Sequence, residues 1–119
     1  MSRTKKTPFP NWATTNPNGI EKRYIRMGNS LLLHPTIRGL SHAAFRVYAH
    51  MMLESGGNIE FTFPHSKWKA FLSAGGFQSA KKELCEAGLI EVTEANANLR
   101  KPNKYRFSTT WKTIKNDDQ

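Results

Sequence analysis

The sequence predicts a single α+β domain in which a three-helix core packs beside a small antiparallel sheet. The length of 119 residues fits one domain. Apolar residues recur at helical spacing in residues 41–54 and 77–87. Apolar and polar residues alternate, as they do in half-buried strands, at 59–63, 90–94 and 104–108. Because the last two strands follow each other in the chain, we expect the fold to end in a β-hairpin.

The net charge of the chain is +9, from 18 Lys and Arg against 9 Asp and Glu. Residues 1–39 hold seven basic residues and one acid, and residues 100–119 hold six and two. Residues 40–99, in contrast, hold five basic residues and six acids. A basic periphery around a nearly neutral centre indicates a polyanionic partner such as nucleic acid. The alternative is that the basic flanks serve only solubility.

The two ends of the chain differ in composition from its centre. Residues 1–22 are rich in Pro, Thr and Asn and predict a flexible basic arm, followed by a domain over 23–112 and a polar tail at 113–119. In the arm, Phe9 and Trp12 are expected either to anchor it on the domain or to stack on a base. The longest apolar run is three residues, so we expect no membrane span and no signal peptide in a cytoplasmic protein.

The first long helix has start and stop signals in the sequence. Residues 23–27 predict an edge strand, and His34-Pro35 predicts a turn before the helix. Ser41 is the expected N-cap, because its hydroxyl can accept a bond from a first-turn amide. Leu40 and Phe45 then have the spacing of a hydrophobic staple. Gly56-Gly57 ends the helix.

The middle of the chain predicts a strand, a short helix and a second long helix. In the strand, Ile59, Phe61 and Phe63 are expected to share the buried face. Residues 65–72 predict a short helix capped by His65 or Ser66, and residues 73–76 predict a turn. The helix 77–87 presents one apolar face and ends in a Schellman stop at Gly88 and Leu89.

The hairpin is predicted from two alternating segments. Ile90 and Val92 are expected to face inward on its first strand, and Tyr105 and Phe107 on its second. Trp111 is expected to fold back onto the domain. The lone Cys85 excludes an internal disulfide and is interpreted as a small buried hydrophobe.

The run from Phe77 to Val92 resembles the recognition helix, glycine stop and first wing strand of the winged helix-turn-helix DNA-binding family. Its residues are Phe-Gln-Ser-Ala-Lys-Lys-Glu-Leu-Cys-Glu-Ala-Gly-Leu-Ile-Glu-Val. The resemblance covers Leu40 to Phe107. The run from Tyr24 to Met52 is similar to the leading segment of winged-helix proteins of bacterial phages, plasmids and conjugative elements. The chain departs from the family at Lys81, where an apolar residue is usual.

The resemblance implies a winged helix-turn-helix fold whose partner is double-stranded DNA in the bacterial cytoplasm. A recognition helix would read the major groove and a basic wing would hold the backbone. The implied role is a transcription regulator, or a DNA replication or maintenance factor of a mobile element. Neither a cofactor nor a catalytic residue is expected.

The candidate DNA-binding residues follow from groove chemistry and from this resemblance. Side chains that point outward near the start of a recognition helix reach base edges. A helix N-terminus and basic side chains hold phosphates. The predicted set is Lys67, Lys69, Ser73, Gly76, Gln78, Ser79, Lys81, Lys82, Arg100, Lys101, Lys104 and Arg106.

The sequence also permits interpretations other than DNA binding by a monomer. A protein–protein adaptor on a winged-helix scaffold, contacted through the arm, is the alternative, and a homodimer also stays open. An enzyme such as a nuclease is disfavoured, because the acids are not clustered for magnesium. Instead, the following are interpreted as a solvated face: Glu83, Glu86, Glu91 and Glu94. His42 and His50 lack further ligands at metal spacing, so no metal site is expected.

Overall fold

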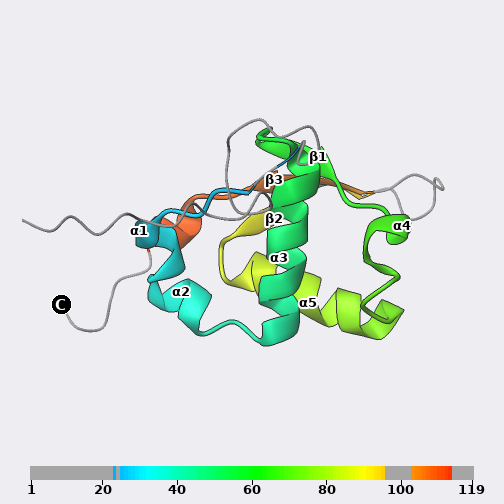
Figure 1. The fold of residues 1–119 in the computed structure, drawn as a ribbon, viewed down its shortest axis with the longest axis horizontal. Coiled ribbons are helices and arrows are strands. Elements are labelled where there is room, and N and C mark those ends of the chain that lie inside the picture. Colours follow the sequence, from blue (N-terminus) through cyan, green and yellow to red (C-terminus); the bar gives the residue numbers. More distant parts are fainter. Residues whose placement is uncertain (1–22, 24, 96–102, 114–119) are drawn as a thin grey trace, which may run out of the picture.

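A computed structural model describes residues 23, 25–95 and 103–113, and it confirms an α+β fold with a small three-stranded antiparallel sheet (Figure 1). The strands are paired in the order β1-β3-β2. None of the helices in the described part is long and apolar enough to span a membrane. The elements are α1 (Asn29–Leu32), α2 (Pro35–Arg38), α3 (His42–Ser55), β1 (Glu60–Thr62), α4 (His65–Trp68), α5 (Ala74–Glu86), β2 (Ile90–Glu94), β3 (Lys104–Phe107) and a 3-10 helix, η3 (Thr110–Thr113).

Helix α3 forms where its capping residues predict it. The Ser41 hydroxyl accepts a hydrogen bond from the Ala44 amide at 3.1 Å. Leu40 and Phe45 are both partly buried against the core, as a staple requires. Gly56 ends the helix in the left-handed region, with φ 61°. The predicted first helix is therefore confirmed within one residue at each end.

Helix α5 begins earlier than predicted, and the expected turn at 73–76 is wrong. Ser73 is the N-cap, and its hydroxyl accepts from the Gly76 amide at 3.0 Å. This bond satisfies a first-turn donor and draws two glycines into the helix. At the other end, the Leu89 amide donates to the Leu84 carbonyl and the Gly88 amide to the Cys85 carbonyl, each at 3.1 Å. These two bonds confirm the Schellman stop.

The segment ahead of α3 differs from the prediction. Residues 25–28 form no strand, because this segment runs beside the end of α3 and has no strand partner. Two single-turn helices, α1 and α2, replace the expected turn. His34 caps α2 by accepting from the Thr36 amide at 3.1 Å, and Pro35 occupies the first helical position. The His34 ring also contacts Trp111, which is buried as predicted.

Helix α4 is shorter than predicted and is held against α5 by aromatic packing. It ends at Trp68, and its N-cap is Pro64 instead of His65 or Ser66. The Trp68 ring is buried and stacks on Phe77 of α5, with centroids 4.5 Å apart and planes 3° apart. This stacked pair fixes the orientation of α4 relative to α5.

The sheet buries fewer residues than the alternating pattern predicts. Phe61, Ile90 and Tyr105 are buried, and Phe107 is partly buried. Ile59, however, is 52% exposed because it precedes β1 at the rim of a cleft. Val92 is 38% exposed, since β2 leaves the core after its first residue.

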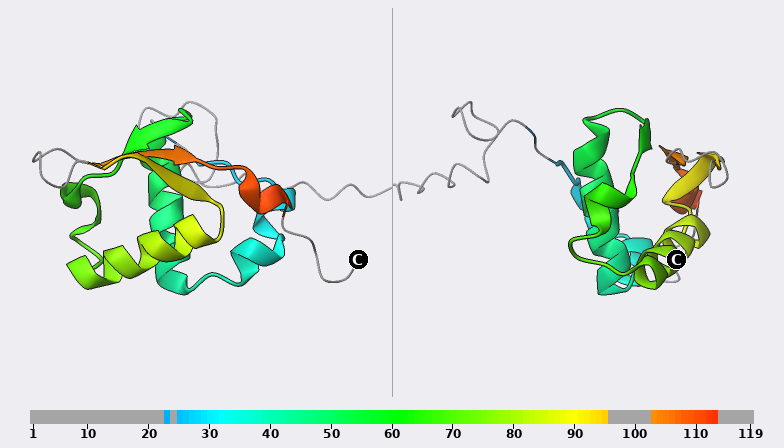
Figure 2. Two further views of the ribbon diagram at one scale, coloured as in Figure 1. Left: turned by 180° about the vertical axis from the view of Figure 1, so that it is seen from behind. Right: turned by 90° about the vertical axis from the view of Figure 1, so that its right-hand side faces the viewer.

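The elements divide the molecule into two ends. Helix α3 packs against both α5 and β1, and Figure 2 shows it beside the sheet in the edge view. Helices α1 and α2 lie at one end (Figure 1). Helix α4, the N-terminal half of α5, the last part of β2 and the first part of β3 lie at the opposite end in both figures.

Candidate nucleic-acid interface

Helix α5 has one buried face and one polar face. Phe77, Ala80 and Leu84 are buried, in agreement with the predicted inward face. On the other side, Gln78, Ser79, Lys82 and Glu86 are exposed. Lys81 is only partly buried and lies between these faces. The three residues predicted to read bases are therefore accessible together on one helix.

A carboxylate from α5 caps α3. Glu83 accepts from the Ser41 amide through Oε2 at 2.6 Å and from the Ser41 hydroxyl through Oε1 at 2.7 Å. In a capping box, a glutamate in the first turn of the same helix accepts from the N-cap amide. Here that acceptor is supplied by a residue 42 positions away in the sequence. The interpretation of Glu83 as a solvated surface acid is wrong. The contact also directs its carboxylate toward α3.

The start of α5 offers fewer open amides than predicted. The Gly76 amide donates to Ser73, so it is not available to a phosphate while the cap is formed. A Cβ at Gly76 would lie 3.2 Å from the Ser73 Oγ and 3.3 Å from Leu72 Cδ2, which explains the glycine. The amides of Ala74 and Gly75 remain at the exposed helix start.

The two lysines predicted to contact the DNA backbone beside α5, Lys67 and Lys69, differ in their ion pairing. Lys67 is paired with Glu54 of α3, with 3.4 Å between Nζ and Oε1. The same carboxylate oxygen lies 3.3 Å from Nη1 of Arg23. Lys69, which follows α4 directly, is exposed and forms no ion pair with a described residue. Lys69 is thus the more accessible cation of the two.

Arg46 is a cation beside the candidate interface that the sequence pattern does not indicate. The Cζ atom of Arg46 on α3 lies 4.5 Å from the ring centroid of Phe71, in the α4–α5 connection. The His50 ring stacks on the same phenyl ring, also at 4.5 Å. The i, i+4 spacing of Arg46 and His50 places both on one side of α3, but the sequence does not reveal that Phe71 lies against them.

The strands of the hairpin are not a cationic surface. Lys104 is paired with Glu94, with 3.4 Å between Nζ and Oε2. Arg106 is opposite Glu60 of β1 and Glu91 of β2 in the register, so one basic residue shares its sheet face with two acids. These neighbours reduce the phosphate attraction predicted for Lys104 and Arg106. The predicted contacts Arg100 and Lys101, and the aromatic pair Phe9 and Trp12, lie outside the described residues.

Cys85 is partly buried on α5, one turn after Lys81. Burial is the largest influence and raises the pKa of its thiol above 9.0; Lys81 lowers that pKa, and Glu86 and Glu91 raise it. A raised pKa disfavours the thiolate and hence a nucleophilic role. Within the described ranges, no three His, Cys, Asp or Glu side chains come together in a way that could hold a metal ion.

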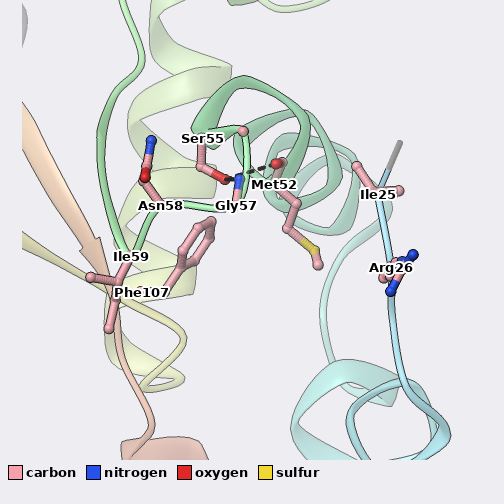
Figure 3. A pocket seen from close by; sticks show the side chains of 9 residues that line it. Ile25, Arg26, Met52, Ser55, Gly57, Asn58, Ile59 and Phe107 are labelled. Carbon is pink, nitrogen blue, oxygen red and sulfur yellow. Dashed lines mark hydrogen bonds between the residues drawn. The ribbon is translucent and has the colours of Figure 1, made fainter. Parts of the chain in front are cut away.

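An open cleft of about 510 Å³ lies at the C-terminal end of α3 (Figure 3). Met52 lies between one wall formed by Ile25 and Arg26 and another formed by Ile59 and Phe107. Ser55 orders its upper edge by donating to the Met52 carbonyl at 2.8 Å. None of the predicted DNA-binding residues lines this cleft.

No protein-family model matches the chain, and neither a curated protein nor a solved structure matches it. A function therefore has to follow from the geometry and the charges of the chain's own residues.

Proposed function

We propose that this protein binds double-stranded DNA sequence-specifically as a winged helix-turn-helix module, with α5 as the recognition helix. The element order α3–β1–α4–α5–β2–β3 supports this, because it is the helix, strand, two helices and hairpin expected of that family. The stacking of Trp68 on Phe77 supports it further, since it supplies the rigid link that a helix pair needs to present one helix to a groove.

The single observation that carries the proposal is the chemistry of the exposed side of α5. From residue 74 to residue 85 its exposed residues are uncharged or cationic: Ala74, Gly75, Gln78, Ser79 and Lys82. The acid within this stretch, Glu83, is bound to Ser41. A helix that enters the major groove passes between two phosphate backbones, so a carboxylate on its leading half would be repelled.

The side chains have distinct roles in this proposal. Gln78 can pair bidentately with adenine, and Lys82 can donate to the acceptors of guanine. Ser79 donates or accepts at either base. Lys69 contacts the backbone beside α4, and Arg46 adds a cation next to the α4–α5 connection. The biological role would be a transcription regulator or a replication or maintenance factor of a mobile element.

Fluorescence anisotropy with a random duplex pool and with sequences selected from that pool tests the proposal. We expect selected duplexes to bind more tightly than the pool. About four phosphate contacts would give a salt slope of roughly 3.6, so affinity should fall about 150-fold between about 50 and 200 mM salt. Failure to bind any duplex at the lower salt would refute the proposal and favour the protein–protein adaptor.

A further inference from the structure

One carboxylate oxygen is shared by two cations at the C-terminal end of α3. Oε1 of Glu54 lies 3.3 Å from Nη1 of Arg23 and 3.4 Å from Nζ of Lys67. The Glu54 side chain is 17% exposed, whereas those of Arg23 and Lys67 are 52% and 44% exposed. The acid is therefore the enclosed member of the trio, and the two bases approach it from solvent.

A nearby cation stabilises Glu54 at its position. It is the second residue from the end of α3, whose C-cap is Gly56. The unpaired carbonyls at a helix C-terminus carry partial negative charge, so a carboxylate there is unfavourable unless a base neutralises it. One cation satisfies this requirement. The second can leave without exposing Glu54 to the unfavourable field.

Lys67 is the cation that DNA would recruit. It is on α4, at the same end of the molecule as the N-terminal half of α5 (Figure 1). Lys67 must break its ion pair with Glu54 to reach a phosphate, and this costs less when another cation stays on the carboxylate. Without that second cation, Lys67 would be held on Glu54, and the salt slope would lose the counterion released by one phosphate contact.

We propose that Arg23 is a positioning residue for DNA binding: by staying on Glu54, it frees Lys67 for a phosphate without contacting DNA itself. The inference rests on the proposed function. A guanidinium has five N–H donors in a planar fork, so Arg23 can keep both oxygens of Glu54 occupied after Lys67 departs.

The test is a double-mutant cycle on the full chain with Arg23→Gln, Glu54→Gln and both together. Anisotropy with one fluorescent duplex gives the affinity and salt slope of each protein. We expect Arg23→Gln to weaken binding about threefold to tenfold and to lower the slope by up to about 0.9, the value of one phosphate contact. Glu54→Gln should strengthen binding. In the Glu54→Gln background, Arg23→Gln should change neither quantity.

A matched control separates this mechanism from general charge. Arg38→Gln removes an exposed cation from α2, at the other end of the molecule. It should change affinity less than Arg23→Gln does. Thermal unfolding of every variant checks that the fold is retained. A variant that had lost packing would show a lower melting temperature as well as a change in the salt slope.

Three outcomes overturn the proposal. If Arg23→Gln weakens binding equally with and without Glu54, then Arg23 contacts phosphate directly. If the wild-type protein binds duplex and Arg23→Gln changes neither affinity nor slope, the inference fails while the proposed function stands. If the wild-type protein binds no duplex at about 50 mM salt, both fail together.

Discussion

Replacement of Glu83 by alanine should destabilise the protein although the side chain is only partly buried. The change removes two hydrogen bonds to Ser41, of 2.6 and 2.7 Å, and leaves the N-cap amide of α3 without its acceptor. Hydrogen bonds to a charged group are worth about 1.5–3 kcal/mol, and solvent access here lowers that value. We expect a total loss of about 1–2 kcal/mol.

Urea unfolding followed by far-UV circular dichroism measures this loss. In thermal unfolding of a domain of this size, each kcal/mol of lost stability should lower the melting temperature by about 4–8 °C. Glu86→Ala is the matched control, because it removes an exposed acid three residues further along α5. Its effect should stay within about 0.5 kcal/mol. Ser41→Ala should be partly non-additive with Glu83→Ala, since both remove the bond between the Ser41 hydroxyl and Oε1 of Glu83.

The result that refutes this reasoning is equal stability of the two glutamate variants. In that case the contact between Glu83 and Ser41 would not contribute to packing of α3 on α5. The proposal that α5 presents DNA with a leading face free of exposed acids would then lose support as well, because it relies on Glu83 being held by Ser41.

The remaining predictions concern the end of α5 and three titratable groups. Gly88→Ala should cost at least about 2 kcal/mol in urea unfolding, because Gly88 has φ +78° and a Cβ would lie 2.5 Å from the Thr110 Oγ1; Gly75→Ala, with no atom within 4 Å of its Cβ, should be neutral or stabilising. Burial raises the pKa of Tyr48 and of Tyr105 above 10.0. The contribution of these two groups to stability should therefore be full below pH 10 and should fall as the pH rises above it. In a pH titration, phenolate absorbance should appear at higher pH for the folded protein than for the protein unfolded in urea; coincident titration curves would contradict this. The raised pKa of Cys85 predicts slower reaction with a disulfide reagent at about pH 8 than free cysteine shows, and Lys81→Gln should slow it further; a rate equal to that of free cysteine would disprove it.

The sequence predicted those features that depend on neighbours in the chain. Ser41 and Gly88 were identified from capping chemistry, which needs only the residues within one helical turn. The outward position of Gln78 and Lys82 followed from the apolar face of the same helix. The candidate site on α5 was therefore largely predictable.

Features that depend on distant residues were missed. Glu83 looked like a surface acid because its partner Ser41 is 42 positions away. Val92 fits an alternating pattern, but the pattern does not show where a strand leaves the core. The ion pair of Lys67 with Glu54 likewise required the packing of α4 against α3. Such contacts are set by tertiary structure, and local spacing carries no record of them.

The most direct test of the central claim is the sequence preference of variants on the outer face of α5. The ratio of affinities for a selected duplex and for a random pool should be measured for Gln78→Ala and Lys82→Ala, with Lys112→Ala on η3 as the control for lost charge. We expect each α5 variant to reduce this ratio roughly 5- to 150-fold, which corresponds to a loss of about 1–3 kcal/mol in discrimination between the two DNAs. The control should leave the ratio unchanged. If both α5 variants keep the affinity and the preference of the wild-type protein, α5 is not the recognition helix and the account is wrong.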